Sequence, residues 1–68
     1  MMGLNIKRML GDFREGERVA IKEGGRTIKG RIVGVFDFFI VVDCGKYKES
    51  FSFIKIGLGE TQVVKGVR

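Results

Sequence analysis

Histidine, tryptophan and proline are absent from this sequence of 68 residues, and cysteine occurs only once. A single cysteine cannot form a disulfide within the chain. Without histidine, a zinc or iron site would lack its most common nitrogen ligand, and the usual catalytic triads would lack the base beside their nucleophile. We therefore expect a protein that is not an enzyme, has no catalytic residues and holds neither a metal nor a cofactor.

The short length allows one small domain, which we expect to span residues 1–68. A domain of this size buries only ~60% of the surface that its unfolded chain exposes, so its core needs additional support. Because disulfides and metals are excluded above, association with another subunit is the remaining common source of stability. The sequence therefore predicts a homo-oligomer, either a dimer or a larger assembly.

Long hydrophobic runs are also missing. The longest apolar stretch, Phe38–Val42, is far too short to cross a bilayer. The first ten residues lack the apolar run of a signal peptide. A lone cysteine is typical of a reducing compartment. These features predict a cytoplasmic protein that does not bind a membrane.

The first segment has the spacing of an amphipathic helix, because apolar residues recur every three or four positions. These residues are Ile6, Met9, Leu10 and Phe13. Lys7 and Arg8 fall on the opposite, polar side. We therefore expect a short N-terminal α-helix and its connection to the rest of the chain over residues 4–13.

Over residues 17–67, apolar residues alternate with polar ones, which is the period of a half-buried β-strand. Gly24 and Gly25 form the predicted tight turn of the first hairpin. The fourth of five expected strands continues through Phe53. The sequence thus predicts a mainly β fold, a small five-stranded antiparallel barrel of the SH3-like or Sm-like type that is preceded by the short helix.

In the second expected strand, apolar residues and glycines share the inner face. They are Ile28, Gly30, Ile32, Gly34 and Phe36. Glycine on the inner face of a long strand indicates a sharp bend or the close approach of another backbone, as at a barrel corner. We therefore expect the second strand either to bend at these glycines or to lie very close to another strand there.

The chain carries a formal net charge of +5, and its basic residues gather mainly in two regions, with Lys46 and Lys48 as a third, smaller group. One region surrounds the first hairpin and the other lies in the expected helix. The residues are Lys22, Arg26, Lys29 and Arg31 in the first region, and Lys7 and Arg8 in the second. Clustered cations on a basic domain indicate binding to a nucleic acid or to an acidic partner. Acidic residues lie between them, so a mixed-charge surface that keeps a small protein soluble is the alternative.

The Phe38–Val42 run places apolar side chains on both faces of one strand. A small barrel can bury only one of these faces internally. Either the N-terminal helix or another subunit must cover the other face. The helix offers few apolar residues, so we expect Phe38, Ile40 and Val42 to contact a second subunit or another protein. Cys44, in the turn that follows, is expected to be a small and partly buried side chain.

Two stretches in the middle of the chain, Gly30–Val33 and Phe36–Phe39, carry a glycine and an aspartate at a separation that is similar to the first motif of Sm-like proteins. Ile40 stands where that motif has a base-binding asparagine. The resemblance implies an Sm-like fold.

A longer series of residues runs through almost the whole chain. It consists of Ile6–Arg8, Leu10, Gly16, Arg18–Lys22, Gly24–Arg26, Gly30, Phe39–Val41, Ser50–Phe53, Glu60, Thr61 and Val63. In order and spacing, this series resembles the Veg family of small proteins from Gram-positive bacteria. The segment Ser50–Phe53 reads Ser-Phe-Ser-Phe where the family has Ser-Tyr-Ser-Tyr.

The Veg resemblance implies a non-enzymatic SH3-like or Sm-like barrel that influences transcription, particularly of biofilm-matrix genes, through contact with a DNA-binding regulator. A transcription regulator is therefore one expected partner. The alternative is an Sm-like or SH3-like protein that binds nucleic acid through the basic residues of its first hairpin.

Overall fold

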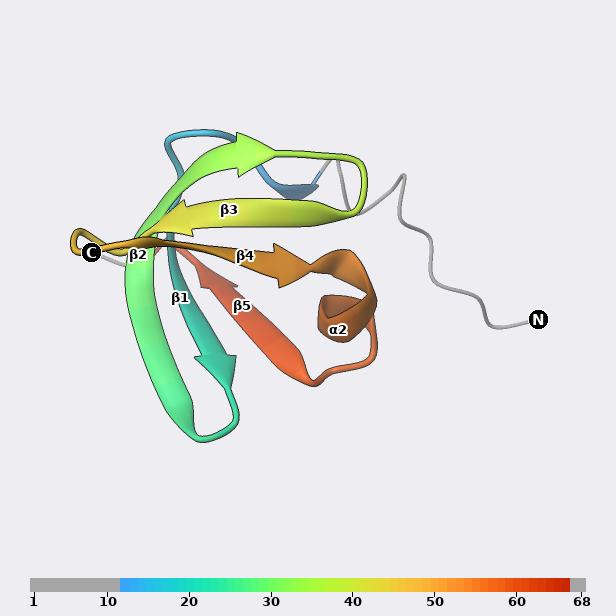
Figure 1. The fold of residues 1–68 in the computed structure, drawn as a ribbon. Helices are drawn as coiled ribbons and strands as arrows, with labels where there is room; N and C mark the ends of the chain where they lie inside the picture. Colours follow the sequence, from blue (N-terminus) through green and yellow to red (C-terminus); the bar gives the residue numbers. More distant parts are fainter. Residues whose placement is uncertain (1–11, 67–68) are drawn as a thin grey trace.

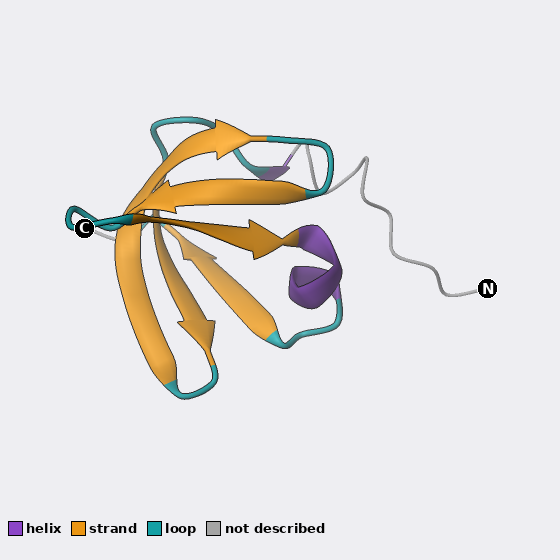
Figure 2. Cartoon of the chain, in the orientation of Figure 1, coloured by secondary structure: helices purple, strands orange, loops and turns teal. Residues whose placement is uncertain are grey.

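The computed structural model describes residues 12–66. Among these residues, five strands form one antiparallel sheet and a single short helix follows the fourth strand (Figures 1 and 2). The elements are β1 (Arg18–Glu23), β2 (Arg26–Val35), β3 (Phe39–Asp43), β4 (Lys48–Ser52), α2 (Phe53–Gly57) and β5 (Thr61–Lys65). The predicted mainly β fold with five antiparallel strands is confirmed. The predicted N-terminal helix, with Lys7 and Arg8, lies outside the described residues except for Asp12 and Phe13.

The strands lie in the order β4-β3-β2-β1-β5, so β5 returns to the free side of β1. β4 and β5 are therefore the two edges of the described sheet, which is not closed between them. Figure 1 shows β2 curving strongly, with α2 beside the ends of β4 and β5. α2 packs against both of these strands.

The first hairpin turns at Gly24 and Gly25, as predicted from the sequence. Their φ angles are +56° and +80°, and a two-residue turn between right-twisted strands of this kind needs positive φ at both positions. Glu23 and Arg26 pair on either side of the turn. Glycine adopts positive φ without steric cost, which explains why two glycines stand here.

β2 contains a β-bulge that changes which side chains reach the core. Ile32 pairs with Val42, whereas Gly34 pairs with Val41, so Val33 is an extra residue on β2. Because side chains alternate with a period of two, one extra residue reverses the alternation of every side chain beyond it.

Beyond the bulge, Val35 packs against the core and Phe36 is exposed. The prediction that Phe36 shares the inner face with Ile28 and Ile32 is therefore wrong. Val35 pairs with the fully buried Ile40, which confirms that residue 35 now occupies the inner face.

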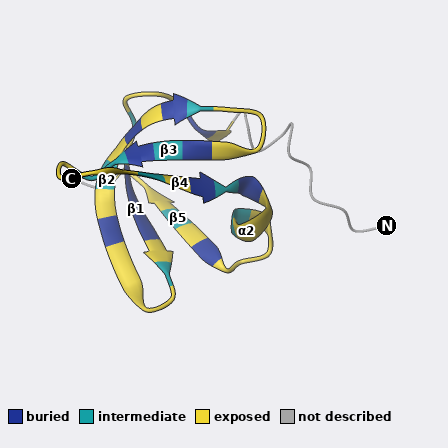
Figure 3. Ribbon diagram, in the orientation of Figure 1, coloured by how far each residue is buried: buried dark blue, intermediate teal, exposed yellow. Residues whose placement is uncertain are grey.

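The hydrophobic core lies within the curved sheet (Figure 3). It is built from Phe13, Val19, Ile21, Ile28, Ile32, Ile40, Val42, Phe51 and Phe53. The rings of Phe13 and Phe53 stack with their centroids 5.7 Å apart. The ammonium group of Lys65 lies 5.0 Å from the centre of the Phe13 ring, a distance at which a cation is attracted by an aromatic face.

β4 ends one residue before Phe53, which corrects the prediction that this strand continues through Phe53. Ser52 caps the helix, since its Oγ accepts a hydrogen bond from the Ile54 N–H at 3.1 Å. The Phe53 N–H donates to the carbonyl of Phe38 at 2.9 Å. Phe53 is fully buried from its position in α2, so the core receives the side chain that the strand was expected to supply.

Gly30 allows the backbone of β3 to come very close to β2, as the sequence predicted. A Cβ atom at Gly30 would collide with the carbonyl oxygen of Asp43 and would lie 2.7 Å from Cγ1 of Val42.

We expect Gly30→Ala to lower the free energy of unfolding by about 1–3 kcal/mol, because the sheet must shift to admit the methyl group. Urea denaturation followed by circular dichroism measures this loss. Ser50→Ala, at an exposed site on β4, is the control, and equal midpoints for the two variants would contradict the close approach.

Candidate binding surfaces

No helix within residues 12–66 is long and apolar enough to span a membrane. In the same part of the chain, no three cysteine, aspartate or glutamate side chains gather in a way that could hold a metal ion. Two groups of exposed side chains within residues 12–66 are candidate binding surfaces, one basic and one aromatic.

Four exposed basic residues share the outer face of β1 and β2, and we call them the cationic face. They are Arg18, Lys22, Lys29 and Arg31. The antiparallel register places Arg18 directly opposite Arg31. Both ion pairs that the structure describes within residues 12–66 are made by Arg26. The positive charge of the cationic face is therefore not balanced by a contacting carboxylate in this part of the chain.

The structure brings Lys22, Lys29 and Arg31 together but separates Arg26 from them. Arg26 has the same strand parity as the inward-facing Ile28, so it lies on the other face of β2. Its guanidinium group donates to Glu49 at 3.0 Å and lies 3.6 Å from a carboxylate oxygen of Glu23.

The hydrogen bond to Glu49 and the nearby negative charge raise the pKa of Arg26 above its ordinary value. Arg26 therefore lies apart from the cationic face, whereas Arg18 belongs to it. The predicted role of Arg26 in binding stays a prediction. The alternation of Arg18 with the buried Val19 is the sequence signal that could have found it.

Three exposed phenylalanines around the β2–β3 turn form the second surface, which we call the aromatic cluster. They are Phe36, Phe38 and Phe39, with exposed fractions of 49%, 63% and 38%. The rings of Phe36 and Phe39 stack with their centroids 5.0 Å apart. Gly34 leaves room for this arrangement, since a Cβ atom there would lie only 2.5 Å from the Phe36 ring.

The burial of Ile40 and Val42 corrects their assignment to an interface. Both side chains are fully buried in the core, so they cannot contact a partner while the sheet is folded. Phe38, the third residue of that predicted interface, is exposed in the turn. The apolar surface predicted for Phe38–Val42 is thus supplied by the turn and by the outward-facing Phe39.

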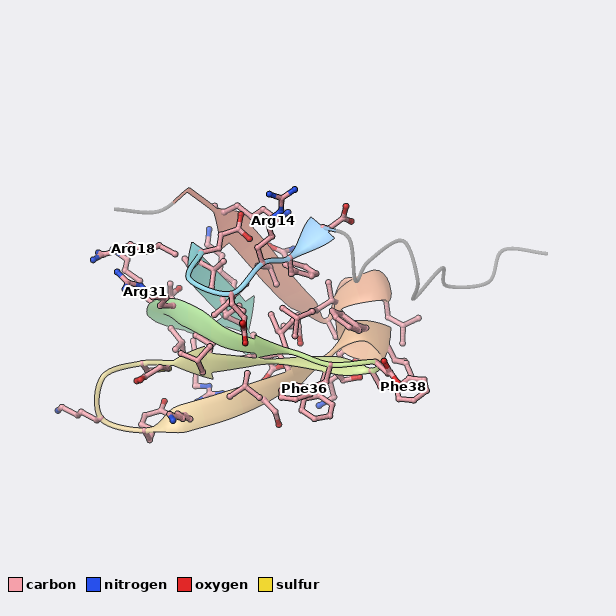
Figure 4. The ribbon with its side chains drawn as sticks, turned by 90° about the horizontal axis from the view of Figure 1, so that it is seen from above. Arg14, Arg18, Arg31, Phe36 and Phe38 are labelled. Carbon is pink, nitrogen blue, oxygen red and sulfur yellow. The ribbon has the colours of Figure 1, made fainter. Side chains whose placement is uncertain are left out.

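The cationic face and the aromatic cluster occupy different parts of the molecule. Figure 4 shows Arg18 and Arg31 beside each other at one end of the sheet, and Phe36 and Phe38 at the other end. The two surfaces can therefore be altered independently by substitution.

The chain matches no protein-family model, no curated protein and no solved structure.

Cys44 is the one cysteine of the chain, and it is half-buried beside the core, as predicted. Burial raises the pKa of its thiol, and the negative charges of Glu49 and Asp43 raise the pKa further. At a given pH, the folded protein therefore holds less reactive thiolate than the unfolded chain.

We expect Cys44 to react with iodoacetamide several-fold more slowly in the native protein than in urea, when the two rates are compared at the same pH near neutrality. Mass spectrometry of quenched samples measures both rates. A free thiol compound, mixed into each sample, corrects for the effect of urea on the reagent. Equal corrected rates would contradict the raised pKa.

Proposed function

We propose that this protein is a non-enzymatic regulator that influences transcription, including that of biofilm-matrix genes, by binding a transcription regulator. The observation that carries the proposal is the aromatic cluster, in which three phenylalanines are exposed around one turn. Aromatic side chains are enriched at the energetic centres of protein interfaces. The resemblance of the chain to the Veg family supports the same partner.

We also propose that the sheet belongs to the SH3-like or Sm-like barrels. The strand order, the strong curvature of β2 and the short helix between β4 and β5 support this fold. The open edges at β4 and β5 support a homo-oligomer, since exposed edge strands favour pairing with another chain. The lone cysteine supports a place in the reducing cytoplasm.

The partner can be identified by photocrosslinking. A photoreactive phenylalanine analogue is placed at Phe38 in one protein and at Leu58 in a control, because Leu58 is also apolar and 61% exposed but lies after α2. We expect a DNA-binding regulator to be crosslinked from position 38 and not from position 58. Recovery of no regulator from position 38, or equal recovery from both positions, would overturn the proposal.

The purified regulator then provides a quantitative test. We expect Phe38→Ser to weaken binding by at least about 30-fold, the effect of losing an interface residue worth 2 kcal/mol or more. Leu58→Ser is the matched control and should bind like the original protein. Isothermal titration calorimetry measures both affinities. Equal binding by the two variants would exclude the aromatic cluster as the contact.

The cationic face favours a second candidate function, which is nucleic-acid binding. Its four basic residues are exposed on one face of two adjacent strands. Neutralising three to four phosphates predicts a slope between about −2.7 and −3.6 for log K against log salt concentration on duplex DNA. Fluorescence anisotropy with short DNA and RNA measures this slope. Absence of binding to either nucleic acid at low salt would overturn the second function.

A further inference from the structure

The cationic face contains two arginines in an electrostatically unfavourable position. Arg18 and Arg31 stand directly opposite each other on β1 and β2. The next pair along the ladder is hydrogen-bonded, because the Ile32 N–H donates to the carbonyl of Glu17 at 2.9 Å. Arg18 and Arg31 therefore fall at a non-hydrogen-bonded position, where opposing side chains approach most closely. Like charges placed opposite each other destabilise a sheet, and an anion between them would turn this repulsion into attraction.

The two arginines line a surface hollow of about 310 Å³, together with Lys29. Gly30 also borders the hollow and contributes no side chain to it. Asp43, which stands opposite Arg31 on β3, is the one acidic residue that lines this hollow, and its Oδ1 accepts a hydrogen bond from the Gly45 N–H at 2.8 Å. Three cations thus face one carboxylate that is held by its own turn, which leaves the hollow with an excess of positive charge.

Two facing guanidinium groups can hold one phosphate group between them. Each guanidinium group presents a planar fork of N–H donors that binds two oxygen atoms at once. In a backbone phosphodiester the two charged non-bridging oxygens are arranged tetrahedrally about phosphorus. Each oxygen can accept from a different guanidinium group, so both arginines can hold one phosphate. Lys29 lies two residues from Arg31 along β2, a distance of about 6.7 Å. Its ammonium group is therefore a further cation that can contact the next phosphate of a nucleic-acid backbone.

We propose that Arg18 and Arg31 together clamp one phosphate of a nucleic-acid backbone, while Lys22 and Lys29 each contact another phosphate. The proposal rests on the second candidate function and adds which residues act on the same phosphate. Three phosphates are then neutralised by four cations. The slope of log K against log salt concentration on duplex DNA is therefore expected to be about −2.7, whereas four cations on four separate phosphates would give about −3.6.

The test compares Arg18→Gln, Arg31→Gln and the double variant. Anisotropy is measured over a salt series with a labelled DNA duplex of about two helical turns, roughly 20 base pairs, and with a single strand of the same length. Lys55→Gln removes the same charge from the exposed surface of α2 and is the control. Circular dichroism establishes that each variant is folded.

A shared phosphate has two measurable consequences for the double variant. We expect the slope on duplex DNA to change by about 0.9, the value for one lost phosphate, and not by about 1.8. We also expect binding to weaken by less than the product of the two single effects, because both residues hold the same group. Arg18→Gln combined with Lys29→Gln should instead weaken binding by the full product. Lys55→Gln should leave both the slope and the affinity unchanged.

The outcomes separate the clamp from the function on which it rests. Absence of wild-type binding to DNA or RNA at low salt overturns nucleic-acid binding itself. A slope change near 1.8 with fully multiplicative effects, or no change at all, overturns the clamp and leaves nucleic-acid binding in place. Inorganic phosphate is titrated alone while the arginine side-chain N–H signals are followed by nuclear magnetic resonance. Tighter binding of this free ion than of the oligonucleotides would overturn the nucleic acid as the source of the phosphate.

Discussion

Replacement of Phe53 by alanine is expected to unfold most of the protein. Phe53 is fully buried and its ring stacks on Phe13 at 5.7 Å. Truncation of a buried phenylalanine costs about 3–5 kcal/mol, from the lost transfer free energy and the cavity that remains. A core of this size rarely supplies more than about 3–5 kcal/mol in total. The loss therefore equals the expected stability of the whole domain.

Urea denaturation monitored by circular dichroism measures the effect, and Phe38→Ala is the matched control. The same substitution is made there on a ring that is 63% exposed, so the free energy of unfolding should change by no more than about 0.5 kcal/mol. Near-native stability in Phe53→Ala would contradict the position of this side chain in the core. A large loss in Phe38→Ala would contradict the exposure of the turn.

Local alternation was sufficient to predict β1 and the first hairpin. Val19 and Ile21 alternate with polar residues and are both fully buried in β1. Gly24 and Gly25 carry the positive φ angles that the turn requires. These features depend only on neighbouring residues, so the sequence pattern contains all the information that they need.

The bulge at Val33 could not be predicted in the same way. Val33 and Val35 are both valines, and either can face a core in a strand. The choice depends on the partner strand, because Gly34 pairs with Val41 after Ile32 has paired with Val42. Register between strands is a non-local property, and a count along β2 alone does not contain it.

The end of β4 was ambiguous for a different reason. Both a strand and a helix that starts at Phe53 place this side chain in the core, so the burial of Phe51 and Phe53 fits either structure. Ser52 is the signal that distinguishes them, since serine is a preferred N-cap and its Oγ accepts from Ile54 N–H. The pattern of apolar residues by itself favoured the strand.

The candidate site was predicted in part. The period of β2 places Lys29 and Arg31 on one face, as the structure confirms. The pairing of Arg26 with Glu49 joins residues that are 23 positions apart in the chain. β3 lies between β2 and β4 in the strand order, so this contact depends on the curvature of the folded sheet, which no local charge pattern reveals.

Ile40 belongs to the apolar run Phe38–Val42, which the sequence pattern assigned to an interface, whereas the structure places Ile40 in the core. Ile40 is fully buried between β2 and β4, opposite Val35 and Phe51. We expect Ile40→Ala to lower the free energy of unfolding by about 2–5 kcal/mol. Val41→Ala, at the next residue on the outward face, is the matched control and should cost about 1 kcal/mol or less.

Protein concentration separates the two assignments of Ile40. A residue that stabilises an association changes how strongly the urea midpoint depends on protein concentration, because binding contributes to stability by mass action. A residue inside one subunit lowers the midpoint equally at every concentration. We therefore expect Ile40→Ala to shift the midpoint without altering its concentration dependence, and sedimentation to give the same mass before and after the substitution. A smaller assembly, or a urea midpoint that falls only in dilute samples, would show that Ile40 lies at the subunit interface and would contradict its place in the core.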